Sequence, residues 1–197
     1  MLISLQNNIT IFAFPKTGTT AVETVLAPYC DIVLSGNPSV KHMPVRKFER
    51  FIRPYLASID FERTETACVL REPLDWLGSW YRYRRRDGLR QRPNSTADVT
   101  FEEFVLAYMS PVPPPYAKVG CPAKFVSRKG GELGIDHLFR YDRFRTYLEF
   151  LQDRFSMHLQ FEQKNVSPTG DLALTATTRN LVQEYLARDY EIFDSIR

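Results

Sequence analysis

The sequence has only three cysteines, Cys30, Cys68 and Cys121, and they lie far apart in the chain. A disulfide framework and a zinc site both need cysteines at paired spacings, so this pattern argues against both. We interpret the three residues as reduced thiols, which favours a cytoplasmic location. No stretch approaches the roughly 20 consecutive apolar residues of a membrane span, and no signal-peptide pattern is visible at the N-terminus.

The chain also carries little net charge. Its 26 Lys and Arg residues against 23 Asp and Glu residues leave +3, which is too small to predict nucleic-acid binding, although it mildly favours anionic ligands. A hydrophobic content of 44% and a charged content of 25% are ordinary for a globular protein. At 197 residues we expect a single domain over residues 1–197.

What the sequence does contain is an alternation of strand and helix patterns. The run from Ile9 to Phe14 is dense in β-formers and ends at Pro15, and its consecutive apolar positions favour a strand covered on both faces. Helical spacing follows from Thr19 to Leu26. Further strands are predicted at 31–34, 67–70 and 137–141, and further helices at 45–56, from about 74, at 101–108, at about 144–151 and at about 175–193. This order predicts a three-layer αβα protein with a central, mostly parallel sheet.

The first strand-to-helix turn reads Pro15-Lys16-Thr17-Gly18-Thr19-Thr20. Ligands of α/β sheets bind at the carboxyl ends of the strands, where this turn should lie. Gly18 lets backbone N–H groups approach an anion, and the helix N-terminus adds a partial positive charge. Threonine hydroxyls and the Lys16 ammonium group add donors. The lysine precedes the only glycine, so this is not a Walker A loop. The alternative is a polar turn whose threonines merely cap a helix.

The segment Phe14–Thr20, followed by Val22, Glu23 and Leu26, resembles the 5′-phosphosulfate-binding loop of the sulfotransferases that use 3′-phosphoadenosine-5′-phosphosulfate (PAPS). This resemblance implies a P-loop NTPase-like sulfotransferase fold, with PAPS as co-substrate and PAP as product. It also implies that the 5′-phosphosulfate is held by Lys16, Thr17, Gly18, Thr19 and Thr20.

Residues 68–81 resemble the 3′-phosphate-binding segment of the same family. Arg71 ends a predicted strand, Pro73 follows, and Ser79 lies on the next helix. Arg71 and Ser79 would converge on one phosphate, to which arginine offers a planar, bidentate fork. The alternative is that Arg71 caps a surface and Ser79 is incidental. The trio Arg128-Lys129-Gly130 is similar to the trio that closes over the 3′-phosphate in cytosolic sulfotransferases, although there it lies nearer the C-terminus.

Sulfuryl transfer requires a base for the acceptor's proton and cations near the bridging oxygen. His42, within Val40-Lys41-His42-Met43-Pro44, resembles the catalytic histidine segment of cytosolic sulfotransferases, although the lysine here is adjacent to the histidine. We expect His42 to be the base and Lys16 to stabilise the leaving group, with Glu23 as the alternative base. His137 and His158 are expected to have structural or surface roles. We expect no metal site.

The predicted function is therefore transfer of a sulfuryl group from PAPS to a hydroxyl or amine of a small-molecule or carbohydrate acceptor. Residues 87–127, with a proline-rich loop and several aromatic residues, are the predicted acceptor side. The arginine run after Ser79 is either a solvated face or an electropositive rim. Two alternatives remain open: a non-catalytic nucleotide- or anion-binding module on the same fold, and a nucleotide-dependent phosphotransferase.

Overall fold

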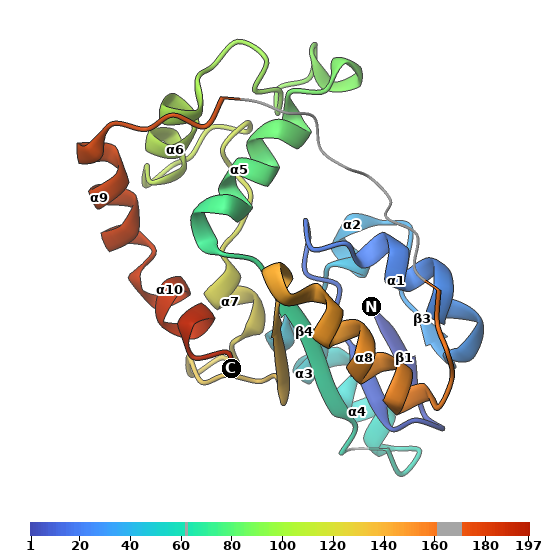
Figure 1. The fold of residues 1–197 in the computed structure, drawn as a ribbon. Helices are drawn as coiled ribbons and strands as arrows, with labels where there is room; N and C mark the ends of the chain where they lie inside the picture. The colour runs from blue at the N-terminus through green and yellow to red at the C-terminus, as the bar shows by residue number, and fades with distance from the viewer. Residues whose placement is uncertain (62, 161–170) are drawn as a thin grey trace. The chain divides into compact units, whose positions relative to one another are not determined.

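The chain forms two compact units in the computed structural model, which describes residues 1–61, 63–160 and 171–197 (Figure 1). The first unit comprises Met1–Arg71, Pro122–Lys164 and Ile196–Arg197, and the second comprises Glu72–Cys121 and Asn165–Ser195. The expectation of one domain over the whole chain stays a prediction. Each unit is described below by itself.

The first unit is built on one five-stranded sheet in the order β3-β1-β2-β4-β5. Its strands are β1 (Leu2–Ser4), β2 (Ile9–Ile11), β3 (Ile32–Val33), β4 (Glu65–Leu70) and β5 (His137–Arg140). The pairs β2–β4 and β4–β5 are parallel, whereas β1 is antiparallel to both of its neighbours. The α/β class is confirmed, but the expectation of a mostly parallel sheet was wrong, because the sheet is mixed.

The antiparallel strand β1 is the reason for that correction. Sequence analysis assigned no strand to Leu2–Ser4, which folds back onto β2 through the turn at residues 5–8. The Asn8 N–H donates to the Leu5 carbonyl at 3.1 Å, and Asn8 has a left-handed φ of 47°. Asparagine tolerates that conformation better than most residues. A turn this short can join only antiparallel strands.

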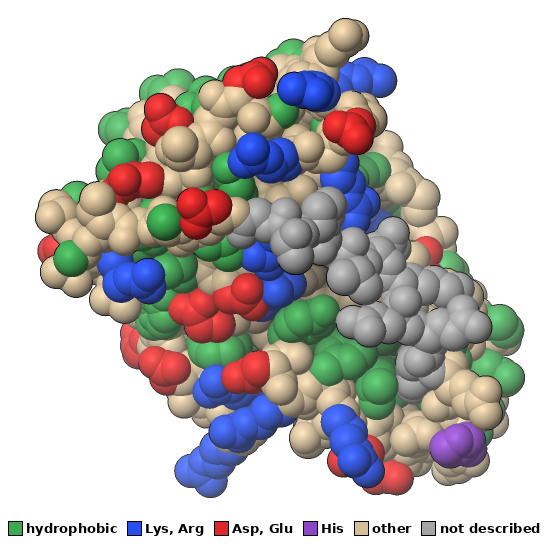
Figure 2. All heavy atoms as spheres, turned by 45° about the horizontal axis from the view of Figure 1, so that its top comes forward, with side chains coloured by type: hydrophobic (Ala, Val, Ile, Leu, Met, Phe, Trp, Pro, Cys, Tyr) green, Lys and Arg blue, Asp and Glu red, His purple; other side chains and the backbone are tan. Residues whose placement is uncertain are grey.

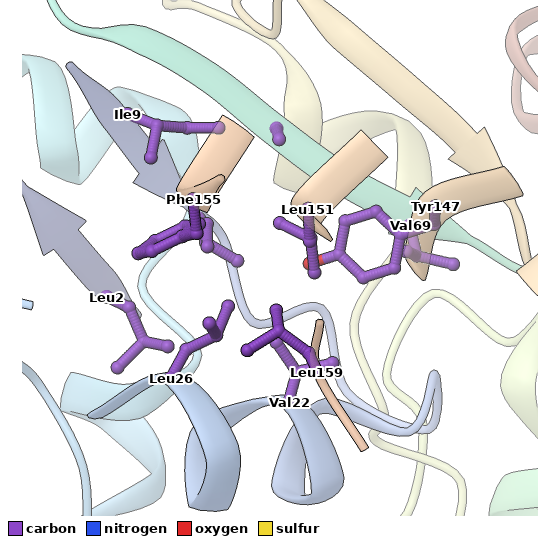
Figure 3. Close-up of a cluster of buried hydrophobic side chains, with 11 residues drawn as sticks. Leu2, Ile9, Val22, Leu26, Val69, Tyr147, Leu151, Phe155 and Leu159 are labelled. Carbon is purple, nitrogen blue, oxygen red and sulfur yellow. The ribbon is translucent and has the colours of Figure 1, made fainter. Parts of the chain in front are cut away.

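Helices cover both faces of this sheet. The helices of the first unit are α1 (Thr19–Leu26), α2 (Pro38–Lys41), α3 (Val45–Phe51), α4 (Arg53–Ala57), α7 (Pro122–Val126) and α8 (Phe144–Phe155), with short 3-10 turns at Ala27–Tyr29 and Tyr141–Arg143. Alternate strand residues point to opposite faces. Ile9 and Ile11 therefore pack with α1 and α8 in the core shown in Figure 3. Phe12 packs instead on Phe48 of α3 and Phe125 of α7, at ring distances of 5.2 and 6.3 Å.

The described part of the second unit is helical. It contains α5 (Pro73–Arg84), a 3-10 turn at Asp87–Leu89, α6 (Phe101–Tyr108), α9 (Ala176–Tyr185) and α10 (Ala187–Asp194). Tyr81 of α5 packs on Phe101 and Phe104 of α6 at 5.4 and 5.8 Å. Glu102 of α6 accepts hydrogen bonds from Thr175 and Thr178 at the start of α9. These contacts join three helices around an aromatic core.

Two predicted helices are divided in the structure. The helix expected over 45–56 is interrupted at Ile52, just before α4, and Pro54 in its first turn has no N–H to continue the ladder. The helix expected over about 175–193 is divided at Leu186, whose ψ of 16° leaves the helical range. Strands predicted at 31–34, 67–70 and 137–141 are confirmed as β3, β4 and β5.

Candidate anion-binding site

The turn between β2 and α1 has an unusual backbone. Lys16 and Gly18 both adopt the left-handed region, each with a φ of 72°. A Cβ on Gly18 would lie 3.3 Å from Cζ of Phe144, so glycine is required there both by the backbone and by space. Lys16 has a Cβ, and this conformation costs such a residue about 1–2 kcal/mol. Strain of this kind is typical of functional loops.

Helix α1 begins at this turn without a side-chain cap. Gly18 is its N-cap, and the first turn contains no acidic residue. The Thr17 hydroxyl donates to the Phe14 carbonyl at 2.8 Å, and the side chain is buried. Thr17 therefore maintains the shape of the turn, while Thr19 is half-buried and Thr20 is exposed. The first N–H groups and the dipole of α1 are thus directed towards a potential anion.

His42 lies directly against the residues that lead into the turn. Its Nδ1 is 2.6 Å from the carbonyl oxygen of Ala13. Since a carbonyl can only accept, Nδ1 carries the proton, and Nε2 has the lone pair in the neutral ring. Burial lowers the pKa of His42, and the nearby Lys41 charge lowers it further, against the opposing effect of the Ala13 hydrogen bond. The imidazole is therefore neutral near pH 7, as a general base must be.

Lys41 and Glu23 form an ion pair beside the turn. Nζ of Lys41 is 2.7 Å from Oε2 of Glu23 and 3.4 Å from Oγ1 of Thr20. The Lys41 ammonium group therefore occupies a carboxylate oxygen of Glu23, whereas Nε2 of His42 keeps its lone pair. The geometry therefore favours His42 over Glu23. It also places beside the turn a cation, Lys41, to which the sequence alone assigned no role.

Arg71 approaches the turn from the neighbouring parallel strand. It follows the last residue of β4, and its Nη1 donates to the Lys16 carbonyl at 3.4 Å. Its guanidinium lies 4.7 Å above the Tyr141 ring. Adjacent parallel strands end at the same edge of a sheet, which explains why residues 55 positions apart meet here. The structure thus brings Lys16, His42 and Arg71 together around one turn.

A small cavity lies behind the turn. Its volume is about 10 Å³, and Ala13, Thr17, Thr19, Glu23 and Tyr147 are among the residues that line it. That space holds about one water molecule. A nucleotide does not fit into this space.

Two predicted site residues are not brought to this turn within the first unit. Ser79 is buried in α5 and belongs to the second unit, whereas Arg71 belongs to the first. Their convergence on one phosphate stays a prediction. Arg128 is exposed in the hairpin at 127–134, where its N–H donates to the Glu132 carbonyl at 2.8 Å. No contact between Arg128 and the turn is recorded among the described residues.

Sequence reasoning missed the role of Arg84. This guanidinium is buried and donates to the carbonyls of Pro115, Tyr116 and Lys118 at 2.8, 2.7 and 3.0 Å. Arg84 is therefore neither on a solvated face nor part of a rim, and it anchors the proline-rich loop of the second unit. A signal existed in the sequence, because prolines leave a loop with more carbonyls than N–H donors.

The remaining charged groups show no single-sign surface in the view of Figure 2, where Lys and Arg side chains lie among Asp and Glu side chains. Nε2 of His137 donates to the Glu65 carboxylate at 2.7 Å, which fits a structural role. Over the described ranges, every helix is too short or too polar to cross a bilayer.

Comparison of the chain with protein-family models, curated proteins and solved structures gives no match. The functional argument therefore rests on the site itself.

Proposed function

We propose that the chain is a cytoplasmic sulfotransferase of the P-loop NTPase-like sulfotransferase fold, which transfers a sulfuryl group from PAPS to a hydroxyl or amine of a small-molecule or carbohydrate acceptor. One observation carries the proposal. The left-handed turn of Lys16 and Gly18 opens the uncapped N-terminus of α1, and His42 is hydrogen-bonded to Ala13 at the entrance of the same turn.

The binding of PAPS follows from this arrangement. The 5′-phosphosulfate lies on the N–H groups at the start of α1, where Thr19 and Thr20 add hydroxyl donors. Arg71, at the end of the next parallel strand, supplies a guanidinium for the 3′-phosphate, and the sequence resemblance implies Ser79 as a second ligand. The three cysteines are free thiols, in agreement with a reducing compartment.

The chemical step needs one base and one source of positive charge. Nε2 of His42 takes the proton from the acceptor hydroxyl or amine while the acceptor atom forms a bond to sulfur. The bond between sulfur and the bridging oxygen breaks in line, and PAP leaves with the electron pair. Lys16 stabilises the negative charge that develops on that bridging oxygen. The proton on His42 is then released to solvent.

Calorimetric titration with PAP tests the proposal, with Lys16→Ala and Arg71→Ala as test variants. We expect micromolar binding that either substitution weakens tenfold or more, about 1.4 kcal/mol. Lys47→Ala is the matched control, because Lys47 is an exposed cation on α3 with no assigned role in PAPS binding, and it should bind PAP like the parent chain. A folded protein that does not bind PAP would overturn the proposal.

His42→Asn separates the enzyme from a non-catalytic module. Asparagine keeps a donor for the Ala13 carbonyl but has no basic nitrogen. We expect unchanged PAP binding and loss of PAPS turnover with a panel of phenols and sugars. Turnover that is equal in the parent chain and the variant would exclude His42 as the base, and PAP binding without turnover in the parent chain would favour the module.

A further inference from the structure

An apolar stripe is left uncovered on helices α3 and α4 of the first unit. The inner side chains Val45, Phe48 and Leu56 are fully buried. Next to them, Phe51 and Tyr55 are 56% and 55% exposed, and Ile59 continues the same four-residue spacing. The apolar surface of these helices is therefore wider than the part that the sheet covers.

Basic residues border this stripe. Arg46, Lys47 and Arg50 are exposed on α3, and the Arg50 guanidinium lies 5.0 Å from the centre of the Phe51 ring. The one carboxylate on α3, Glu49, is held by Arg53 of α4 at 2.8 Å. The uncompensated charge on the outer side of α3 is therefore positive.

Two neighbouring segments extend the positive charge. Helix α7, which packs against α3, exposes Lys124. In the hairpin at 127–134, a Cβ on Gly134 would meet both Val45, the first residue of α3, and the side chain of Arg128. Arg128 therefore belongs to the surface around α3. Exposed aromatic residues flanked by basic residues on a short helical surface are typical of segments that lie in the headgroup region of an anionic bilayer.

We propose that the α3–α4 surface, defined by Lys47, Arg50, Phe51 and Tyr55, binds an anionic phospholipid surface. Phe51 and Tyr55 enter the headgroup boundary, and Lys47 and Arg50 pair with lipid phosphates. Charge complementarity argues for this occupant, and the aromatic stripe argues for a partner with an apolar layer. The proposal does not depend on the proposed sulfotransferase activity, because none of these four residues is assigned to PAPS.

Co-sedimentation with phosphatidylcholine vesicles, with and without phosphatidylglycerol, tests the proposal. We expect binding only to vesicles that contain phosphatidylglycerol. Lys47→Gln with Arg50→Gln should weaken that binding by about fivefold per charge, and added salt should weaken binding by the parent chain. Phe51→Ser with Tyr55→Ser should weaken binding by at least about tenfold.

A matched control lies on α9 in the second unit. Leu181 and Tyr185 are 47% and 54% exposed, and the nearest charges in sequence are the single Arg179 and Glu184. Leu181→Ser with Tyr185→Ser should leave vesicle binding unchanged. Melting temperature and PAP titration check that every variant is folded and that any loss is confined to the lipid surface.

Three outcomes would overturn the proposal. The first is equal sedimentation with and without phosphatidylglycerol, and the second is an equal loss of binding in the α9 control. The third is binding of a single-stranded oligonucleotide through Phe51 and Lys47 without vesicle binding, which would assign the same surface to nucleic acid.

Discussion

The N-termini of α1 and α6 differ in how their first N–H groups find hydrogen-bond acceptors. The first N–H groups of any helix have no partner within it. At α6, Thr100 accepts from the Glu103 N–H at 3.2 Å, and the Glu103 carboxylate accepts from the Thr100 N–H at 2.7 Å. At α1, Gly18 stands at the N-cap without any side-chain bond. The α6 terminus is closed by its own residues, whereas the α1 terminus remains open to an external acceptor.

The backbone conformations at the two helix N-termini also differ. Thr100 has a relaxed φ of −73°, whereas Lys16 and Gly18 near α1 are both left-handed. Local strain and an unfilled cap at α1, compared with a relaxed and filled cap at α6, support the proposal that an anion binds at the start of α1. The following predictions would either sharpen this contrast or abolish it, and they run from the largest expected effect to the smallest.

Gly18→Ala should have the largest effect. The new Cβ meets the Phe144 ring at 3.3 Å, and the left-handed backbone becomes strained. We expect the free energy of unfolding to fall by about 2 kcal/mol and PAP binding to weaken by more than tenfold. Urea denaturation and calorimetric titration measure the two effects. A variant that is as stable as the parent chain and binds PAP normally would show that the open α1 terminus is not a binding site.

Lys16→Gly should change stability and binding in opposite directions. Glycine relieves the left-handed strain, so the folded state should gain up to about 1 kcal/mol, reduced by the greater freedom of glycine in the unfolded chain. Loss of the ammonium group should weaken PAP binding tenfold or more. Denaturation midpoints and titration should therefore diverge. Parallel losses in both would identify Lys16 as a structural residue only.

Thr100→Ala is the counterpart at the closed terminus. It removes a capping box, so we expect the free energy of unfolding to fall by about 1 kcal/mol. PAP binding should not change, because α6 already satisfies its own N–H groups. If Thr100→Ala weakened PAP binding as much as Lys16→Ala does, the distinction between the two termini would not hold.

The predictable part of the site is the part that is local in the chain. A buried strand, a glycine and a helix pattern follow one another within residues 9–26, so the turn and its lysine could be identified from sequence. Arg71 was also placed correctly at the end of a strand, because parallel strands end at one edge of a sheet. The meeting of Arg71 with Lys16 is a direct consequence of that rule.

The rest depends on contacts that no local pattern encodes. Three residues, Leu2–Ser4, are too short a run to reveal a strand, yet they change the sheet from parallel to mixed. Helical spacing continues through Ile52 and Leu186. Pro54 was a visible signal for the first break, whereas no residue near Leu186 marked the second. Lys41 reaches Thr20 across 21 positions, and Arg84 reaches Lys118 across 34. Neither partner can be inferred from the residue type alone.

Glu23→Gln should have a smaller effect on PAP binding at the α1 terminus. It removes the carboxylate that holds Lys41 at 2.7 Å and leaves the ammonium group beside Thr20. We expect PAP to bind a few times more tightly, by less than about 1 kcal/mol, because the substitution removes a single negative charge beside the turn. Glu102→Gln at α6 is the matched control and should leave PAP binding unchanged. Loss of PAPS turnover in Glu23→Gln with normal binding would instead make Glu23 the base.

The smallest effect concerns pH, and it also differs between the two regions. Burial lowers the pKa of His42 from its ordinary 6.5, so below that pH the unfolded chain binds a proton that the folded chain resists. Stability linked to His42 is therefore present at neutral pH and is lost as the pH falls below 6.5. At α6, hydrogen bonds from Thr100 lower the pKa of Glu103 from 4.5, so its stabilising effect is lost only at more acidic pH.

His42→Asn should flatten the decrease in melting temperature between about pH 7 and pH 5, whereas Thr100→Ala should leave that interval unchanged. An unchanged slope in His42→Asn would mean that His42 is protonated as easily in the folded chain as in the unfolded one, and its role as a neutral base would lose its electrostatic support.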